Sequence, residues 1–156
     1  MQATESPVLG QTAPEFTLKG PGGQPVSLSD YRGKQNVLLV FYPLAFSPVC
    51  SHQLPEVQKA LADFEALDTV VLGISVDSHY ANTAFARHLR LHFPLLSDFE
   101  HAASIAYGVL IPQKRYSGRA LFVVDKSGAL IHVDVAPDVD QIPSTGKALA
   151  ALRAQG

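Results

Sequence analysis

The fold of this chain is decided by the stretch Asn36-Val37-Leu38-Leu39-Val40-Phe41-Tyr42-Pro43. From Val37 to Tyr42 its side chains are apolar or aromatic without interruption, and the proline ends the run. A strand with one solvated face alternates polar and apolar residues, whereas an unbroken apolar run is typical of a strand covered on both faces. We therefore expect residues 36–42 to form the central strand of a sheet packed on both sides.

An amphipathic helix is predicted directly after this strand, from Cys50 to about Asp68. Apolar residues recur there three and four positions apart with charged residues between them, as expected for one buried helical face. These apolar residues are Leu54, Val57, Leu61, Phe64 and Leu67. Residues 69–76 then read as a second buried strand and residues 80–91 as a second helix. This β-α-β-α order is typical of α/β proteins.

The rest of the chain extends the same unit. The further predicted elements are a short strand at 93–97, a short helix at 102–107, two strands at 120–124 and 129–135, and a last helix from Ser144 or Thr145 to Arg153. Upstream, residues 16–18 and 25–28 flank a glycine-rich turn and predict a hairpin, followed by a helical turn at 29–33. We expect one domain spanning 1–156, in the α/β class. Its predicted thioredoxin-like fold has a central mixed sheet with helices on both faces and an N-terminal β-hairpin extension.

Composition limits the possible functions. The chain has 156 residues, 47% of them hydrophobic, and a net charge of -2 from 12 basic and 14 acidic side chains. Like charges do not form long runs, so neither nucleic acid nor an anionic membrane surface is an expected partner. Residues 1–16 do not resemble a secretory signal, and the longest apolar stretch, Val37–Phe46, is too short to span a bilayer. With one cysteine, the chain is expected to be a cytoplasmic protein without disulfides.

The single cysteine lies at the junction between the central strand and the helix after it. The carboxyl end of a strand that opens into a helix N-terminus is where ligands and catalytic groups collect in α/β sheets. The helix end favours a thiolate, which is the reactive form of cysteine. Free cysteine is often only a packing residue. Cys50, however, lies outside both the apolar run of the strand and the apolar face of the helix. It is flanked by proline and serine, which favours a reactive role over a packing role.

The residues around Cys50 resemble the active-site signature of the peroxiredoxin (AhpC/TSA) family. Pro43-x-x-x-Ser47-x-x-Cys50 matches the family's Pro-x-x-x-Thr/Ser-x-x-Cys. The resemblance covers nearly the whole chain and includes residues 13–18, 93–98, 107–109 and 119–128. The phrase Phe41-Tyr42-Pro43-Leu44-Ala45-Phe46 is most similar to the one-cysteine alkyl hydroperoxide reductase E subgroup.

This resemblance implies a thiol-dependent peroxidase that reduces hydrogen peroxide and organic hydroperoxides. Cys50 would be the peroxidatic cysteine, and Ser47 would supply a hydroxyl to the thiolate and the incoming peroxide. Pro43 would shield the pocket, and Arg119 would hold both thiolate and peroxide. Seen alone, Ser47 would be read as a helix cap, Pro43 as a strand terminator and Arg119 as a solvated charge.

Three positions depart from the expected pattern or leave a question open. Gln53 stands where the family often has glutamate, so it can accept a hydrogen bond but carries no charge. Phe85 replaces a tryptophan common in relatives and is expected to be a core residue. Pro55 must either open a new first turn at Leu54 or kink the helix just after Cys50, which leaves open whether Cys50 lies within a helical turn.

The single cysteine also determines which partners are needed. Oxidation of Cys50 to a sulfenic acid leaves no second thiol in the chain to resolve it, so an external thiol is required. Glutaredoxin, thioredoxin and small thiols such as glutathione, mycothiol or bacillithiol are all possible. The resemblance further favours a homodimer, and neither a cofactor nor a metal is expected.

Three other functions are compatible with parts of this sequence. A thiol–disulfide oxidoreductase would share the fold, but it normally needs Cys-x-x-Cys, and the first of those positions here is Ser47. A metal-binding module could use His88 and His92, which lie four apart, but no third ligand is evident. A papain-type protease also pairs cysteine with histidine, yet its local signature is absent.

Overall fold

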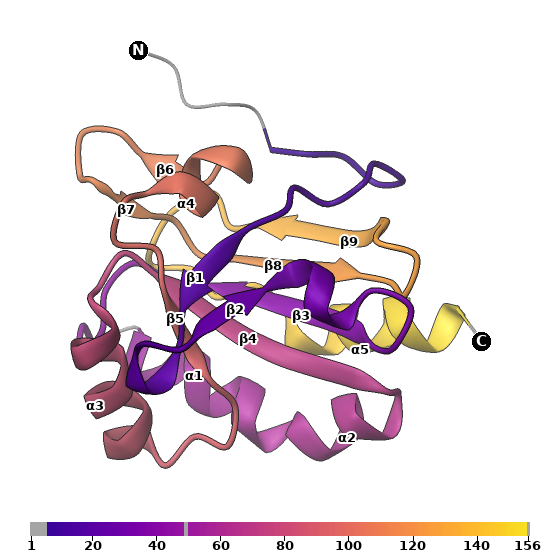
Figure 1. The fold of residues 1–156 in the computed structure, drawn as a ribbon, viewed down its shortest axis with the longest axis horizontal. Coiled ribbons are helices and arrows are strands. Elements are labelled where there is room, and N and C mark those ends of the chain that lie inside the picture. Colours follow the sequence, from indigo (N-terminus) through magenta and orange to yellow (C-terminus); the bar gives the residue numbers. More distant parts are fainter. Residues whose placement is uncertain (1–5, 49, 156) are drawn as a thin grey trace.

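The computed structural model describes residues 6–48 and 50–155, and within these ranges the side chains of Cys50 and Ser51 are not described. Its centre is a seven-stranded mixed sheet with the order β2-β1-β5-β4-β3-β8-β9 (Figure 1). The strands of this sheet are β1 (Thr17–Lys19), β2 (Pro25–Ser27), β3 (Asn36–Phe41), β4 (Thr69–Ser75), β5 (Leu95–Ser97), β8 (Ala120–Val124) and β9 (Leu130–Val135). The predicted central strand is β3, and both of its faces are covered.

The pairing of β3 determines what lies at its carboxyl end. β3 runs parallel to β4 and antiparallel to β8, and its last residue, Phe41, pairs with Ile74 and with Ala120. Because β8 runs in the opposite direction, it begins where β3 ends. The residue before β8, Arg119, is therefore placed at the edge of the sheet where the first helix begins.

Four α-helices pack on one face of the sheet. They are α1 (Cys50–Lys59), α2 (Leu61–Ala66), α3 (His79–Leu89) and α5 (Thr145–Ala154). The connections from β3 to β4 and from β4 to β5 cross the sheet in the same direction. Because such crossovers are right-handed, the helices within these two connections lie on the same face of the sheet. Buried residues of these helices form one cluster with β3, including Leu38, Val40, Leu54, Phe64, Phe85 and Leu149.

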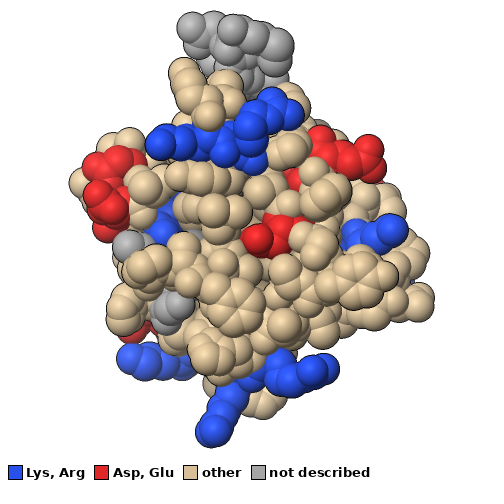
Figure 2. Space-filling view, turned by 90° about the vertical axis from the view of Figure 1, so that its left-hand side faces the viewer, with Lys and Arg blue, Asp and Glu red and all other residues tan. Residues whose placement is uncertain are grey.

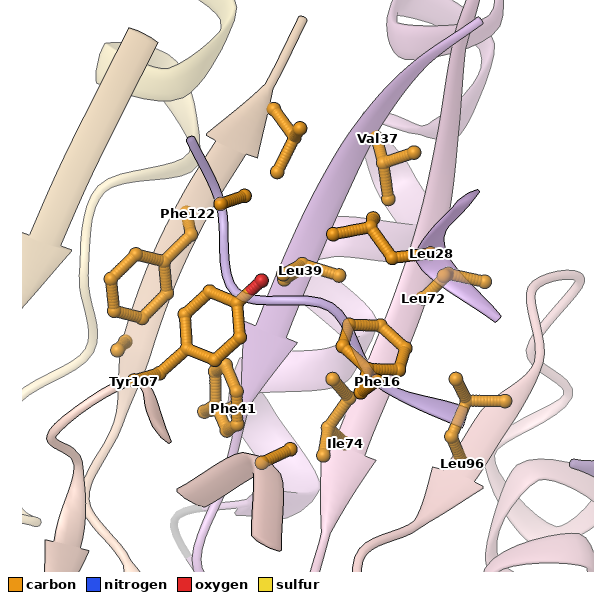
Figure 3. Close-up of a cluster of buried hydrophobic side chains, with 14 of the residues drawn as sticks. Phe16, Leu28, Val37, Leu39, Phe41, Leu72, Ile74, Leu96, Tyr107 and Phe122 are labelled. Carbon is orange, nitrogen blue, oxygen red and sulfur yellow. The ribbon is translucent and has the colours of Figure 1, made fainter. Parts of the chain in front are cut away.

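The opposite face is covered by the N-terminal segment, by α4 (Ala102–Ala106) and by the 3-10 helix η2 (Leu28–Tyr31). Figure 3 shows the aromatic centre of this layer, in which Tyr107 lies between Phe16, Phe41 and Phe122 at ring distances of 5.0 to 6.4 Å. The Tyr107 hydroxyl donates to the Pro14 carbonyl at 2.7 Å, and burial raises the pKa of Tyr107, so the group stays a donor. Helices on both faces of the sheet are thus confirmed. One face carries four α-helices, and the other carries, among the described residues, only α4 and η2.

The predicted N-terminal hairpin is confirmed and is part of the main sheet. β1 and β2 pair antiparallel, and β1 also bridges to β5 through Lys19 and Ser97. The turn between them contains the 3-10 helix η1 (Pro21–Gly23), in which Gly22 and Gly23 adopt positive φ. The hairpin therefore extends the central sheet at one edge.

The prediction of one continuous helix from Cys50 to Asp68 is wrong. The segment is divided at Ala60, whose φ and ψ are −95° and 2°. The Ala60 N–H donates to the Val57 carbonyl at 3.0 Å, a tightened final turn that ends α1. The apolar pattern itself is right, because its members at 54, 57, 61 and 64 are all buried.

Pro55 and a second, smaller sheet complete the description of the fold. α1 begins at Cys50 and continues past Pro55, so the proline does not open a new helix. A small two-stranded sheet of β6 (Leu110–Ile111) and β7 (Tyr116–Ser117) was not predicted, because two-residue strands leave no readable pattern. Among the helices described, none combines the length and apolarity needed to cross a membrane.

Candidate active site

The segment between β3 and α1 carries three of the four predicted site residues. Pro43 follows the strand and is buried. Ser47 is partly buried, and its hydroxyl donates to the Leu44 carbonyl at 2.9 Å. Between them, Phe46 adopts a left-handed φ of 66°, with its ring 4.8 Å from that of Phe85 on α3. The loop is thus shaped by a backbone turn and by packing against α3.

Cys50 is the first residue of α1, at the carboxyl end of a strand in the sheet. The thiol itself, the predicted nucleophile, lies outside the described residues. Its backbone position is the one expected from the sequence, since the first turn of a helix presents N–H groups without intrahelical acceptors. These groups and the helix dipole favour negative charge at this end of α1.

Arg119 reaches the same region from the other side of β3. Although it lies at the base of β8, its side chain is buried, with 3% of its surface exposed. Its Nη1 donates to the Gln53 side chain at 2.8 Å and its Nε to the Val139 carbonyl at 2.6 Å. Both of these acceptors are neutral oxygens, so these two bonds orient the guanidinium without neutralising its charge. The reading of Arg119 as a solvated charge is therefore wrong.

Gln53 connects Arg119 to the strand. It is 1% exposed and follows Cys50 by three residues in α1. Its Oε1 accepts from Arg119, and its Nε2 donates to the Phe41 carbonyl at 3.3 Å. An ionised glutamate could accept the first bond but could not donate the second. The amide therefore links β3, α1 and the arginine in one arrangement.

Sequence reasoning missed the polar residues that support the loop. Ser117 is fully buried, and its hydroxyl donates to the Tyr42 carbonyl at 3.2 Å. Asp77 follows β4, and its carboxylate accepts the Ala45 N–H at 2.7 Å. A signal for Asp77 was present, because polar residues that directly follow a buried strand lie at the edge where sites form.

The histidines considered as metal ligands do not form a cluster. His92 interacts with Gln58, which accepts its backbone N–H at 2.7 Å, whereas the His88 ring lies 5.6 Å from the ring of Phe46. In the described part of the chain, no group of three or more histidine, cysteine, aspartate or glutamate side chains could hold a metal ion. Phe85 is fully buried, which confirms the prediction that it belongs to the core.

We expect the Gln53→Leu variant to lose about 3 kcal/mol of unfolding free energy, because it leaves buried polar groups of Arg119 and Phe41 without their partner. Urea unfolding measures the loss. The matched control is Gln58→Leu, the same change on the same helix, where the hydrogen bonds to His92 are exposed. There we expect a loss of about 1 kcal/mol or less. Equal losses for the two variants would contradict the bridging role of Gln53.

Comparison with known proteins identifies the family. The sequence model of the AhpC/TSA family matches residues 9–133. Alkyl hydroperoxide reductase E of Mycobacterium tuberculosis is 44% identical over 124 residues, which are 78% of this chain and 81% of the relative. The chloroplastic 2-Cys peroxiredoxin BAS1 of Arabidopsis thaliana is 36% identical over 97% of this chain and 63% of its own length.

The fold agrees with this assignment. The reduced 2-Cys peroxiredoxin of Plasmodium vivax superposes with a TM-score of 0.86 at 30% identity, covering 94% of this chain and 81% of that one. The thioredoxin-like fold expected from the sequence is thereby confirmed, and the alternative of a thiol–disulfide oxidoreductase is not favoured. The chain belongs to the AhpC/TSA family of thiol-dependent peroxidases.

Proposed function

We propose that this thiol-dependent peroxidase uses Cys50 as its peroxidatic residue and works by a one-cysteine cycle. Ser47 and Arg119 hold the hydroperoxide against the thiolate, and Pro43 shields the pocket from water. The substrates are hydrogen peroxide and organic hydroperoxides. An external thiol regenerates the enzyme, because the sequence contains no second cysteine.

The observation that best supports these roles is the fixed position of the Arg119 guanidinium. It is buried at the carboxyl end of β3 and is joined through Gln53 to the first turns of α1. A cation held in advance by a residue of α1 requires little reorganisation when negative charge develops near the start of that helix. In the proposed mechanism this charge would stabilise the negative charge that thiolate attack transfers to the leaving oxygen.

The proposed cycle balances with one protein thiol. The Cys50 sulfur attacks one peroxide oxygen, the O–O bond breaks, and the other oxygen leaves as water or an alcohol after it takes a proton. Cys50 becomes a sulfenic acid, which an external thiol converts to a mixed disulfide with loss of water. A second external thiol then releases Cys50. Glutaredoxin, thioredoxin and a small thiol all fit this scheme, and the cytoplasm would supply any of them.

A stopped-flow experiment tests this function. The reduced protein is mixed with hydrogen peroxide and, separately, with tert-butyl hydroperoxide, and formation of the sulfenic acid is followed with a trapping reagent. Each candidate reductant is then added to the oxidised protein. One sulfenic acid per chain, cleared by at least one reductant, is the expected result. A thiol that reacts no faster than free cysteine would refute the proposal.

A homodimer is the proposed assembly, and one exposed face supports it. Phe46, Tyr80 and Phe99 follow the carboxyl ends of β3, β4 and β5, which are parallel neighbours, and they are 53%, 77% and 66% exposed. Figure 2 shows the side of the molecule that carries α3, where Lys and Arg lie mainly near the upper and lower edges, a few Asp and Glu side chains lie between them, and the rest of the surface between is uncharged. Exposed aromatic residues are enriched in protein interfaces, and a two-fold dimer would bury this face against itself.

We expect Tyr80→Glu to weaken this dimer, because it places two like charges in a face that packs on its own copy. The side chain is largely exposed, so the folded chain should keep its stability. Sedimentation velocity over a concentration series measures the change. Gln155→Glu, which adds the same charge on an exposed residue after α5, is the control and should leave the dimer intact. A monomeric wild type, or an unchanged dimer of Tyr80→Glu, would contradict the assembly.

A further inference from the structure

A carboxylate supports the loop that carries Ser47, and the family assignment gives it no role. Asp77 lies just after β4, and its Oδ2 accepts two hydrogen bonds of 2.7 Å, from the Ala45 N–H and from the Ser75 hydroxyl. A role for this carboxylate rests on the proposed function, because it concerns how Ser47 is presented to the peroxide.

The group held by Asp77 is one end of a single peptide unit. The Ala45 N–H and the Leu44 carbonyl belong to the same planar amide, so fixing the direction of the N–H fixes the direction of the carbonyl. That carbonyl accepts the Ser47 hydroxyl at 2.9 Å and also the Ser47 N–H at 3.4 Å. The carboxylate therefore acts on Ser47 through one rigid amide.

Asp77 is itself held in place by the ends of β4 and β5. Its carbonyl accepts the Ser97 hydroxyl at 2.7 Å, and its N–H donates to the Ser75 hydroxyl oxygen at 3.2 Å. Ser75 is in turn bonded to the buried Asn82, whose Oδ1 also accepts the Tyr42 hydroxyl at 2.6 Å. The carboxylate is thus held by a polar network that links the ends of β3, β4 and β5 to α3.

We propose that Asp77 is a positioning residue for peroxide reduction, which orients the Leu44–Ala45 peptide and through it the hydroxyl of Ser47. A hydrogen bond from an amide to an ionised carboxylate is stronger than one to a neutral oxygen, and it polarises the amide. The carbonyl then attracts the Ser47 hydroxyl proton more strongly. With that proton directed to Leu44, the Ser47 oxygen acts toward the substrate as an acceptor, for the O–H of a hydroperoxide.

This role predicts a particular pattern of rates. Asp77→Ala should lower the second-order rate of Cys50 oxidation by hydrogen peroxide about tenfold or more, because a reacting group is no longer held in its productive geometry. Alkylation of Cys50 by iodoacetamide, which has no peroxide O–H to orient, should change by less than about threefold. In a Ser47→Ala background, Asp77→Ala should also add less than about threefold, because the group through which it acts is gone.

The control is Asp98→Ala. Asp98 is another carboxylate that holds backbone N–H groups, at Ala103 and Ser104, but it lies at α4. It should lower the unfolding free energy and leave the oxidation rate of the folded protein unchanged. Asp77→Asn, which keeps the shape and an acceptor oxygen, should recover part of the rate and serves as the test if Asp77→Ala does not fold.

Three results would overturn the role of Asp77. They are an unchanged oxidation rate, an equal fall in alkylation, and a fall of the same size in the Ser47→Ala background. Failure of the proposed function is distinguishable from all of these, because the wild-type protein would then show no rapid oxidation by peroxide.

Discussion

The Cys50→Ser variant is expected to reduce no hydroperoxide, with a loss of about a millionfold or more in rate, the scale of enzymatic acceleration itself. The replaced atom is the one that is oxidised, and a serine hydroxyl cannot accept the oxygen to form a sulfenic acid. Because Cys50 is the single cysteine, no other thiol in the chain can substitute for it. Peroxide consumption over one turnover, with a count of free thiols before and after, measures the effect.

A second variant tests whether the position of the thiol matters as well as its presence. Cys50→Ser combined with Ser51→Cys keeps one thiol per chain and moves it by one residue in the first turn of α1. Successive helical residues point about 100° apart, so the displaced thiol should react as an ordinary cysteine. Peroxide reduction by Cys50→Ser, or a rapid reaction of the displaced thiol, would show that the site has been assigned wrongly.

Much of the fold could be predicted because its signals are local and repeated. The unbroken apolar run of β3 required cover on both faces, and the spacing of Leu54, Val57, Leu61 and Phe64 identified the buried side of the following helices. The turn before β9 contains Gly128, whose φ is 92°, a conformation that glycine adopts at little cost. Each of these features depends on residues close together in the chain.

The unpredicted features depend on contacts between distant segments. The division at Ala60 has no glycine or proline to mark it, and it is visible only in the structure, in the backbone angles of Ala60. The bond from Ala45 to Asp77 joins residues 32 positions apart. Motif matching identified Pro43, Ser47 and Arg119 as candidates, yet only the register between β3 and β8 explains why Arg119 lies at the start of α1.

Arg119→Ala is expected to lower the rate of Cys50 oxidation about a hundredfold to a thousandfold, the usual cost of removing a donor that stabilises developing charge. Ionisation of the thiol cannot account for a loss of this size. Full ionisation of a thiol with a pKa of about 8.5 raises the thiolate fraction at neutral pH about thirtyfold and makes the sulfur a weaker nucleophile. The remaining loss must come from the transition state, where the leaving oxygen gains charge.

Comparison of two reactions of Cys50 separates these contributions. Alkylation by iodoacetamide across a pH series reports the ionisation and nucleophilicity of the thiol, and oxidation by hydrogen peroxide adds the stabilisation of the leaving oxygen. Arg119→Ala should therefore impair oxidation at least about tenfold more than alkylation. Equal losses in the two reactions would mean that Arg119 acts only by favouring ionisation of the thiol.

Arg119→Lys tests whether the geometry of the guanidinium is needed as well as its charge. The wild-type side chain binds Gln53 through Nη1 and Val139 through Nε, so its planar group is held along two of its edges. Lysine keeps the positive charge but cannot reproduce that fixed fork of donors. We expect alkylation close to wild type and oxidation that stays about tenfold or more below it. Recovery of the full oxidation rate by lysine would mean that charge alone is sufficient, and that the Gln53 bridge serves stability rather than catalysis.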